Sequence, residues 1–327
     1  MPAPGGGHRQ QSGTVATMTD NPAWRPRHDD PLFILAMDHR ESFGRTLFEV
    51  KNDEPDQAER EAMSSAKLLI FDGLRAALPA VRAGRPGVLV DERYGQGVID
   101  EAKSDREQIV LAIPIEASGH EWFTLEWGDQ WLEHVEANKP DYAKILVRDN
   151  PEFDASQREG QFARLAGISS GLHGAGVPLL YELLVPATDA QLAKAGGDAM
   201  AYDRDIRPGL VCQVIADNQA HAVEPTLWKV EGLETVDAAR QVAAQAKAGG
   251  RDADLIVLGR DAPVGRLDHW LQVASEVSEF VGFAIGRSIW EDAVREYEAS
   301  DRSQDAARHA AATVTERYLG FVAQWTT

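Results

Sequence analysis

The sequence predicts a single (β/α)8 barrel, an α/β fold in which eight parallel strands alternate with helices. Three observations support this fold. Eight short runs of aliphatic and β-branched residues recur along the chain, amphipathic segments separate them, and the pattern occupies about 250 residues, the usual length of such a barrel. Strands that alternate with helices in this way pair in parallel through right-handed crossovers.

The expected strands are uninterrupted apolar runs, as strands that are covered on both faces require. In chain order they comprise residues 32–37, 87–90, 109–115, 142–147, 178–184, 226–230, 255–258 and 281–285. A doubly wound open sheet is the alternative. Because that fold usually has a glycine-rich turn after its first strand, whereas Asp38-His39-Arg40 stands at this place, we favour the closed barrel.

The expected helices carry apolar residues at intervals of three and four. They comprise residues 57–81, 125–138, 156–173, 208–220, 236–248, 266–280, 288–299 and 302–324. Pro55 suits the first turn of the first helix. Trp325 follows the last helix and is expected to pack against an end of the barrel.

The composition limits the classes of partner. The 327 residues include 52 acidic and 33 basic side chains, for a formal net charge of −19. Such a surface repels nucleic acids and anionic membranes, and no apolar run approaches the roughly 20 residues of a membrane span. Residues 1–30 are rich in Gly, Pro, Gln and charge and lack the apolar region of a secretory signal. We therefore expect a disordered tail at 1–30, one domain over 31–327 and a cytoplasmic enzyme.

Polar residues stand in or directly after every expected strand. Catalytic groups of (β/α)8 barrels lie at these carboxyl ends. In strand order the residues are Asp38 to Arg40, Asp91, Glu116, Lys144, Glu182, Lys229, Gly259-Arg260 and Gly286-Arg287.

Lys144 and Lys229 each have apolar neighbours on both sides within an expected strand. A charged amine is costly inside a barrel unless it is paired or functional. Desolvation and a second nearby cation favour the neutral amine, and a neutral amine attacks a ketone to form an iminium, a strong electron sink. A buried ion pair with Glu182 or Glu116 is the alternative, which we consider weaker for Lys229 than for Lys144.

Two Gly-Arg steps end the last two expected strands, at Gly259-Arg260 and Gly286-Arg287. The loops after strands seven and eight of such barrels often bind phosphate through backbone N–H groups, a helix N-terminus and a cation. Ser288 opens the next expected helix directly. This placement indicates a phosphate site, although a salt bridge from Arg260 to Asp261 is the alternative for that side chain.

The carboxylates admit several roles. Glu182 is a candidate acid/base, a role that benefits from a raised pKa. Asp38, Asp91 and Glu116 either orient substrate hydroxyls or anchor the cationic side chains, and Asp38 is the second candidate base. The acidic strand ends leave a metal site as an alternative, but no histidine-rich ligand set accompanies them.

With these motifs in place, the sequence resembles the class I aldolases related to tagatose-1,6-bisphosphate aldolase, and most of all the 2-deoxy-5-keto-gluconate-6-phosphate aldolase branch. The resemblance covers residues 33–325. The motifs that carry it are Leu35-Ala36-Met37-Asp38-His39-Arg40, Val90-Asp91-Glu92-Arg93-Tyr94-Gly95, Lys144-Ile145-Leu146-Val147, Trp228-Lys229-Val230-Glu231 and Gly282-Phe283-Ala284-Ile285-Gly286-Arg287.

The resemblance implies a metal-independent barrel without a cofactor, with the Schiff-base lysine at Lys229 and a second active-site lysine at Lys144. It also implies an acid/base at Glu182 and phosphate near Gly286 and Arg287. Arg260 departs from the family, where a small or apolar residue is expected, and this leaves room for a second anionic group on the substrate.

The expected activity is cleavage or formation of a carbon–carbon bond in a phosphorylated ketose or keto-sugar acid. Dihydroxyacetone phosphate and an aldehyde are the expected products. We expect the partner to be this small phosphorylated sugar, with no nucleic acid or membrane, and the protein to be a homo-oligomer. The alternatives are a barrel isomerase or decarboxylase on a sugar phosphate, and a non-catalytic sugar-phosphate-binding partner of a sugar kinase.

Overall fold

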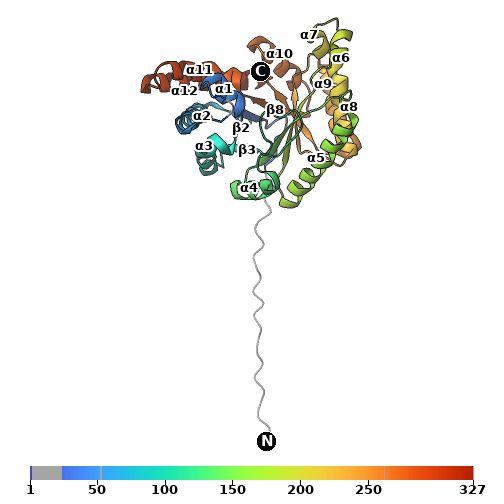
Figure 1. The fold of residues 1–327 in the computed structure, drawn as a ribbon, viewed down its shortest axis with the longest axis horizontal. Coiled ribbons are helices and arrows are strands. Elements are labelled where there is room, and N and C mark those ends of the chain that lie inside the picture. Colours follow the sequence, from blue (N-terminus) through green and yellow to red (C-terminus); the bar gives the residue numbers. More distant parts are fainter. Residues whose placement is uncertain (2–23, 52–53, 261, 327) are drawn as a thin grey trace.

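The structure, a computed structural model, describes residues 1, 24–51, 54–260 and 262–326. Its centre is a closed barrel of eight parallel strands in sequence order (Figure 1). They are β1 (Leu32–Ala36), β2 (Arg85–Leu89), β3 (Val110–Pro114), β4 (Tyr142–Arg148), β5 (Leu179–Leu184), β6 (Leu227–Glu231), β7 (Asp254–Leu258) and β8 (Phe280–Ile285). Pairing of β1 with β8, with Leu32 opposite Gly282, closes the ring. The predicted (β/α)8 barrel is confirmed, and each predicted strand overlaps an observed one.

Helices surround the barrel (Figure 1). The longer ones are α2 (Gln57–Ala77), α3 (Glu92–Ser104), α4 (Trp131–Asn138), α5 (Ala155–Ala175), α8 (Arg207–Ala220), α9 (Val236–Ala246), α10 (Val264–Ser275), α11 (Arg287–Ala299) and α12 (Gln304–Thr326). Shorter elements are α1 (Glu41–Leu47), α6 (Asp189–Lys194), α7 (Ala199–Ala201), the 3-10 turns Leu78–Ala80, Gly128–Gln130 and Ala248–Gly250, and a π-helical turn, Tyr202–Ile206.

Helices α1, α3, α6 and α7 lie outside the helices predicted from the sequence. In α3 the two glycines, Gly95 and Gly97, weaken the helical signal. Gly95 is needed there because a Cβ atom would lie 2.1 Å from Cγ2 of Val90. The close approach of α3 to the end of β2 therefore requires glycine at position 95, although glycine has a low helix propensity.

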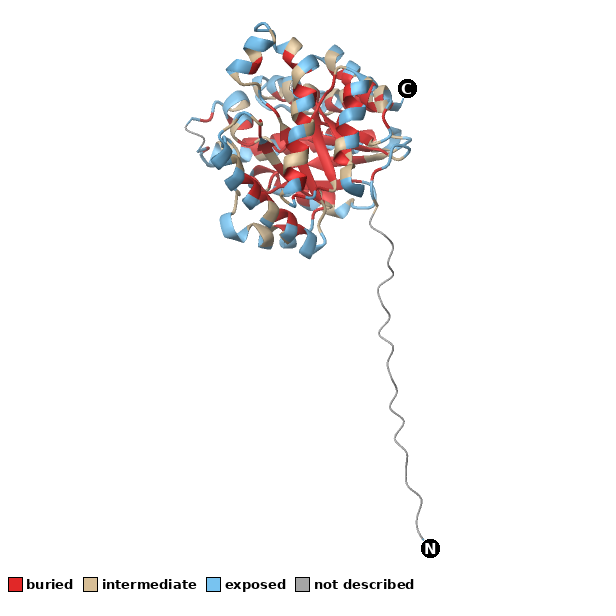
Figure 2. Ribbon diagram, turned by 90° about the vertical axis from the view of Figure 1, so that its right-hand side faces the viewer, coloured by how far each residue is buried: buried red, intermediate tan, exposed pale blue. Residues whose placement is uncertain are grey.

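Two apolar layers form on the two faces of the strands, and the buried residues concentrate at the centre of the molecule (Figure 2). Side chains of a strand alternate between the faces. Thus Leu32 and Ile34 belong to the cluster inside the barrel, whereas Phe33 and Leu35 pack against the surrounding helices. Trp325 lies on this outer side, edge-on to Phe33 with ring centroids 6.4 Å apart.

The barrel interior is apolar at the end where the strands begin. Trp24 packs against the interior cluster, and the guanidinium of Arg85 lies 4.7 Å from the centre of its ring. The indole N–H of Trp24 donates to Asp30. Residues 24–30, which the sequence analysis assigned to the disordered tail, therefore pack on the barrel, while residues 2–23 of that tail lie outside the described part.

Among the described helices, none is both long enough and apolar enough to cross a lipid bilayer.

Candidate active site

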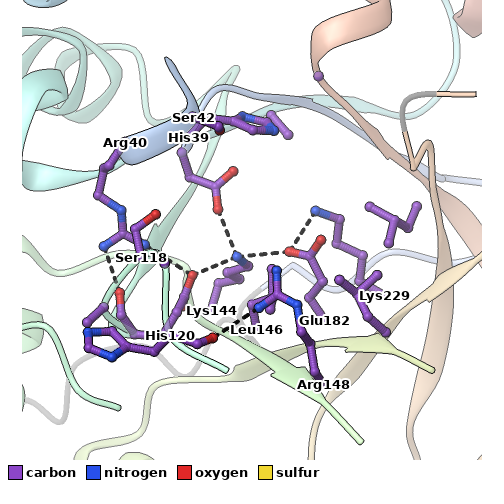
Figure 3. Close-up of a pocket in the computed structure, with 18 of the residues that line it drawn as sticks. His39, Arg40, Ser42, Ser118, His120, Lys144, Leu146, Arg148, Glu182 and Lys229 are labelled. Carbon is purple, nitrogen blue, oxygen red and sulfur yellow. Dashed lines mark hydrogen bonds and ion pairs between the residues drawn. The ribbon is translucent and has the colours of Figure 1, made fainter. Parts of the chain in front are cut away.

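A pocket of about 360 Å³ opens where the strands end (Figure 3). The strand ends and the segment 117–124, which follows β3, form its walls. The described lining contains six Lys or Arg and four Asp or Glu side chains. The pocket thus concentrates positive charge in a protein whose net charge is −19, which favours an anionic ligand there.

Lys144 lies at the centre of three carboxylates. Its Nζ atom is 2.8 Å from Asp38, 2.8 Å from Glu116 and 2.9 Å from Glu182. Burial has the largest single effect on the pKa of Lys144 and would lower it, but the three carboxylates together outweigh burial and raise that pKa. Lys144 is therefore a fixed ammonium ion, and its nitrogen occupies the space between the acidic groups.

Lys229 is the second buried lysine of the pocket and is 2% exposed. Its Nζ atom lies 3.0 Å from Oε2 of Glu182, the same oxygen that lies near Lys144. The register of β5 and β6 places Glu182 directly beside Lys229. Within the described residues this is the one ion pair of Lys229, so its amine is far less constrained than that of Lys144.

The pKa of Glu182 is shifted in the opposite direction from the raised pKa that an acid/base role favours. Burial would raise its pKa, yet Lys144 and Lys229 outweigh burial and lower it. The resting side chain is therefore a carboxylate, a proton acceptor. The raised pKa belongs instead to Glu116, where burial outweighs the attraction of Lys144 and Arg40.

Asp38 and His39 follow β1 and line the pocket. Burial would raise the pKa of Asp38, but its cationic neighbours, Lys144 first, lower it. Burial lowers the pKa of His39 to about 4, so the ring is neutral at physiological pH. Its Nδ1 atom is buried without a hydrogen-bond partner, and the ring packs edge-on against Trp290.

Arg40 anchors the segment that forms one wall of the pocket. Its guanidinium donates to the backbone oxygen of Glu116 at 2.6 Å and lies 3.1 Å from Glu126. It also reaches the Glu116 carboxylate at 3.3 Å. Glu126, which the sequence analysis did not single out, holds this contact because residues 116 and 125 form a β-bridge. Arg40 is thus neutralised by two acidic residues.

Asp91 does not line the pocket. Its carboxylate accepts the backbone N–H of Tyr94 at 2.9 Å and so caps α3. It also forms a buried ion pair with Lys67 of α2, whose amine donates to the backbone oxygen of Met37 at 2.8 Å. Asp91 and Lys67 therefore stabilise the backbone that follows β1 from outside the pocket. Lys67 had no signal in the sequence beyond its place on the apolar side of a helix.

The expected phosphate end lies between β7 and β8, where Gly259, Gly286 and Arg287 line the pocket. Helix α11 begins at Arg287, directly after Gly286. A Cβ atom on Gly286 would lie 2.5 Å from the backbone oxygen of Ala36. Glycine therefore lets β8 end close against β1, with the first amides of α11 at the pocket.

Arg260 also lines the pocket, but acidic residues hold it. It lies 2.9 Å from Asp203 and 3.0 Å from Glu231. Asp203 belongs to the π-helical turn and also pairs with Arg207 and Arg266. The expected alternative partner, Asp261, is outside the described residues.

Arg148 is a lining residue that sequence reasoning missed. The predicted fourth strand ended at residue 147, whereas β4 continues to Arg148. The alternation of Lys144, Leu146 and Arg148 along one face of the strand would have revealed it. No group of three or more His, Cys, Asp or Glu side chains in the described ranges is arranged to hold a metal ion.

Several solved structures are similar to this chain at low sequence identity. The Cgl0159 protein of Corynebacterium glutamicum is 17% identical, with a TM-score of 0.52 over 88% of this chain and 86% of that one. A monomeric dihydrodipicolinate synthase variant is 11% identical, with a TM-score of 0.42 over 91% and 82% of the two chains. YagE of Escherichia coli K12, in complex with pyruvate, is 13% identical, with a TM-score of 0.40 over 89% and 80%.

No curated protein matches the sequence. The model of one protein family matches residues 18–327. The chain therefore belongs to this family, which is described as an uncharacterized protein conserved in bacteria (DUF2090).

Proposed function

We propose that the protein is a class I aldolase that cleaves or forms a carbon–carbon bond in a phosphorylated ketose or keto-sugar acid, with Lys229 as the Schiff-base lysine. The observation that carries the proposal is the 3.0 Å distance between Nζ of Lys229 and Oε2 of Glu182. The other lysine of the pocket, Lys144, stays protonated because three carboxylates raise its pKa. The resemblance to tagatose-1,6-bisphosphate aldolase and 2-deoxy-5-keto-gluconate-6-phosphate aldolase supports the same assignment.

The first stage forms the iminium. The ammonium of Lys229 gives a proton to the Glu182 carboxylate, which lies within reach, and the neutral amine adds to the substrate ketone. Glu182 then returns the proton to the carbinolamine hydroxyl, which leaves as water. The product of this stage is a cationic iminium at Lys229, with Glu182 again a carboxylate.

The second stage breaks the bond. Glu182 removes the proton of the hydroxyl group on the far carbon of the scissile bond, which becomes the aldehyde carbon, and the bond electrons flow into the iminium. An aldehyde leaves and a neutral enamine remains. Glu182 then protonates the enamine carbon, and water hydrolyses the resulting iminium to the ketone product, dihydroxyacetone phosphate, and the ammonium of Lys229.

Lys144 acts electrostatically in this scheme. Its fixed positive charge, 2.9 Å from Glu182, stabilises the carboxylate form and the negative charge that develops on the substrate oxygen. Amides at the start of α11 and the Arg287 side chain hold the phosphate, which keeps the ketone at the amine.

Borohydride trapping tests the proposal. After incubation with dihydroxyacetone phosphate and borohydride, mass spectrometry of the digested protein should find a reduced adduct on the peptide that contains Lys229. Lys229→Met should give none. Because a sugar-phosphate sensor forms no such adduct, nor does an isomerase or decarboxylase that uses its lysine as a proton carrier, the experiment separates these rival functions. An adduct on Lys144 would exchange the two lysine roles, and the absence of any adduct with phosphorylated ketoses would refute the Schiff base.

A further inference from the structure

Arg148 differs from the other arginines of the pocket whose partners are described above. Arg40 and Arg260 are each neutralised by two acidic residues. Arg148 makes one hydrogen bond, from Nη1 to the backbone oxygen of His120 at 3.3 Å, and no described carboxylate lies within ion-pair distance of it. The side chain is exposed and lines the pocket. Its positive charge is therefore available to a ligand.

The position of Arg148 follows from the order of the strands. The first amides of α11 and Arg287 follow β8, Lys229 is on β6, Glu182 is on β5, and Arg148 ends β4. In a closed barrel of eight strands, β4 and β8 stand opposite each other. A ligand that extends from α11 across the pocket therefore meets Lys229, then Glu182, and then Arg148, in this sequence.

This order matches the order of groups that the proposed reaction requires. The phosphate lies next to the ketone, the ketone must reach Lys229, and the hydroxyl group that loses its proton must reach Glu182. The atoms beyond that hydroxyl belong to the half that leaves as the aldehyde. They extend toward β4, where the apolar Leu146 also lines the pocket, as does Leu184 of β5, the register partner of Arg148.

We propose that Arg148 is a specificity residue that binds an anionic group on the aldehyde half of the substrate. This inference rests on the aldolase function proposed above. A guanidinium presents parallel N–H donors that match carboxylate and phosphate oxygens alike. The bond to His120 holds the guanidinium at the pocket wall (Figure 3) and leaves the remaining donors for this anion.

Aldol addition of dihydroxyacetone phosphate to different aldehydes provides the test. The acceptors are glyoxylate and glyceraldehyde 3-phosphate, which carry a carboxylate and a phosphate, with glyceraldehyde as the neutral reference. In the wild-type protein kcat/KM should be larger for at least one anionic acceptor than for glyceraldehyde. Arg148→Ala should reduce this ratio by roughly 10- to 100-fold, the effect of losing a charged hydrogen bond. The acceptor with the larger loss identifies the anion.

Arg164→Ala is the matched control, because Arg164 is an exposed arginine on α5, away from the pocket lining. It changes the net charge equally and should leave the ratio as in the wild type. Equal ratios in Arg148→Ala and wild type would overturn the proposal. A loss of the same size in Arg164→Ala would assign the effect to overall charge and would also overturn it.

A binding experiment separates this proposal from the proposed function. Calorimetric titration with malonate, in the Arg287→Ala background to remove the other anion contact, needs no catalysis. An added Arg148→Ala change should weaken malonate binding by roughly tenfold or more. Unchanged affinity would show that Arg148 binds no carboxylate, even if trapping at Lys229 succeeds. Weakened affinity without any trapped adduct would support the anion site and reject the aldolase.

Discussion

The Nζ atom of Lys229 lies 3.0 Å from Oε2 of Glu182, and the two residues are direct neighbours in the register of β6 and β5. A carboxylate in this position both accepts a proton from the amine and remains close to the atoms that the amine binds. The same oxygen lies 2.9 Å from Lys144, whose fixed charge keeps Glu182 ionised. Proton transfer at this site therefore depends on Lys144, Glu182 and Lys229. The pairing of β4 with β5 and of β5 with β6 aligns these three side chains.

Lys144→Met should reduce both stability and turnover. The change leaves Asp38, Glu116 and Glu182 buried together without the cation that they share. Removing one partner of a buried ionic group costs about 3–5 kcal/mol. Urea denaturation at pH 7 should show this loss, and lowering the pH should diminish it because protonated carboxyls repel less. A denaturation midpoint equal to that of the wild type would contradict the ionic arrangement.

His39 should make the stability depend on pH between about 6.5 and 4. Burial lowers its pKa to about 4 in the folded protein, whereas an unfolded histidine titrates near 6.5. Within this window the unfolded chain binds a proton that the folded protein does not, so stability falls as the pH falls, by at most about 3 kcal/mol for this partly exposed ring.

His39→Gln should flatten this dependence, because glutamine does not titrate. Thermal or urea unfolding of both proteins at several pH values measures the slope. The depressed pKa of Asp38 acts at lower pH, since it contributes stability above about pH 4 that is lost on further acidification. Identical slopes in the two proteins between pH 6.5 and 4 would exclude His39 as the source.

Lys67→Met should destabilise the protein although it lies outside the pocket lining. The change leaves the buried Asp91 carboxylate without its ion-pair partner, which costs about 3–5 kcal/mol. The double variant Lys67→Met, Asp91→Asn should recover part of the loss because no buried charge remains. If Asp91→Asn instead raised KM without a change in stability, Asp91 would orient the substrate, which is the other of the two roles expected from the sequence.

Gly282→Ala should disrupt closure of the barrel. Gly282 has a φ of +135°, and a Cβ atom there would lie 1.9 Å from the backbone oxygen of Leu32 on β1. The strain and the collision should lower the melting temperature or prevent soluble expression. Gly160→Ala on α5 is the control, since no atom lies within 4 Å of the added Cβ. It should be neutral or stabilising by up to about 1 kcal/mol, and an equal loss in both variants would contradict the explanation.

Arg287→Ala should mainly raise KM for a phosphorylated ketose. The expected phosphate contact is made in the ground state and in the transition state alike, and losing such an interaction affects KM more than kcat. Steady-state kinetics with phosphorylated and unphosphorylated forms of one ketose provide the measurement. Unchanged kinetics with the phosphorylated form would remove Arg287 from the site.

The sequence determined the barrel and the strands that carry the two lysines. Each strand is a continuous apolar run, because both of its faces are covered, and each helix shows its own periodicity, so these signals are local. Once the strands are counted, the rule that barrel sites form at strand ends selects Asp38, Glu116, Lys144, Glu182 and Lys229. All five line the pocket.

Only the tertiary structure decided what each charge does. Lys144 and Asp38 are 106 residues apart in the chain, and Asp91 and Lys67 are 24 apart on different elements, so no local pattern pairs them. Closure of the barrel brings three carboxylates around Lys144, directs Asp91 away from the pocket and lowers the pKa of Glu182. The charge state of a buried group depends on its neighbours in space and on its distance from water, and folding alone sets both.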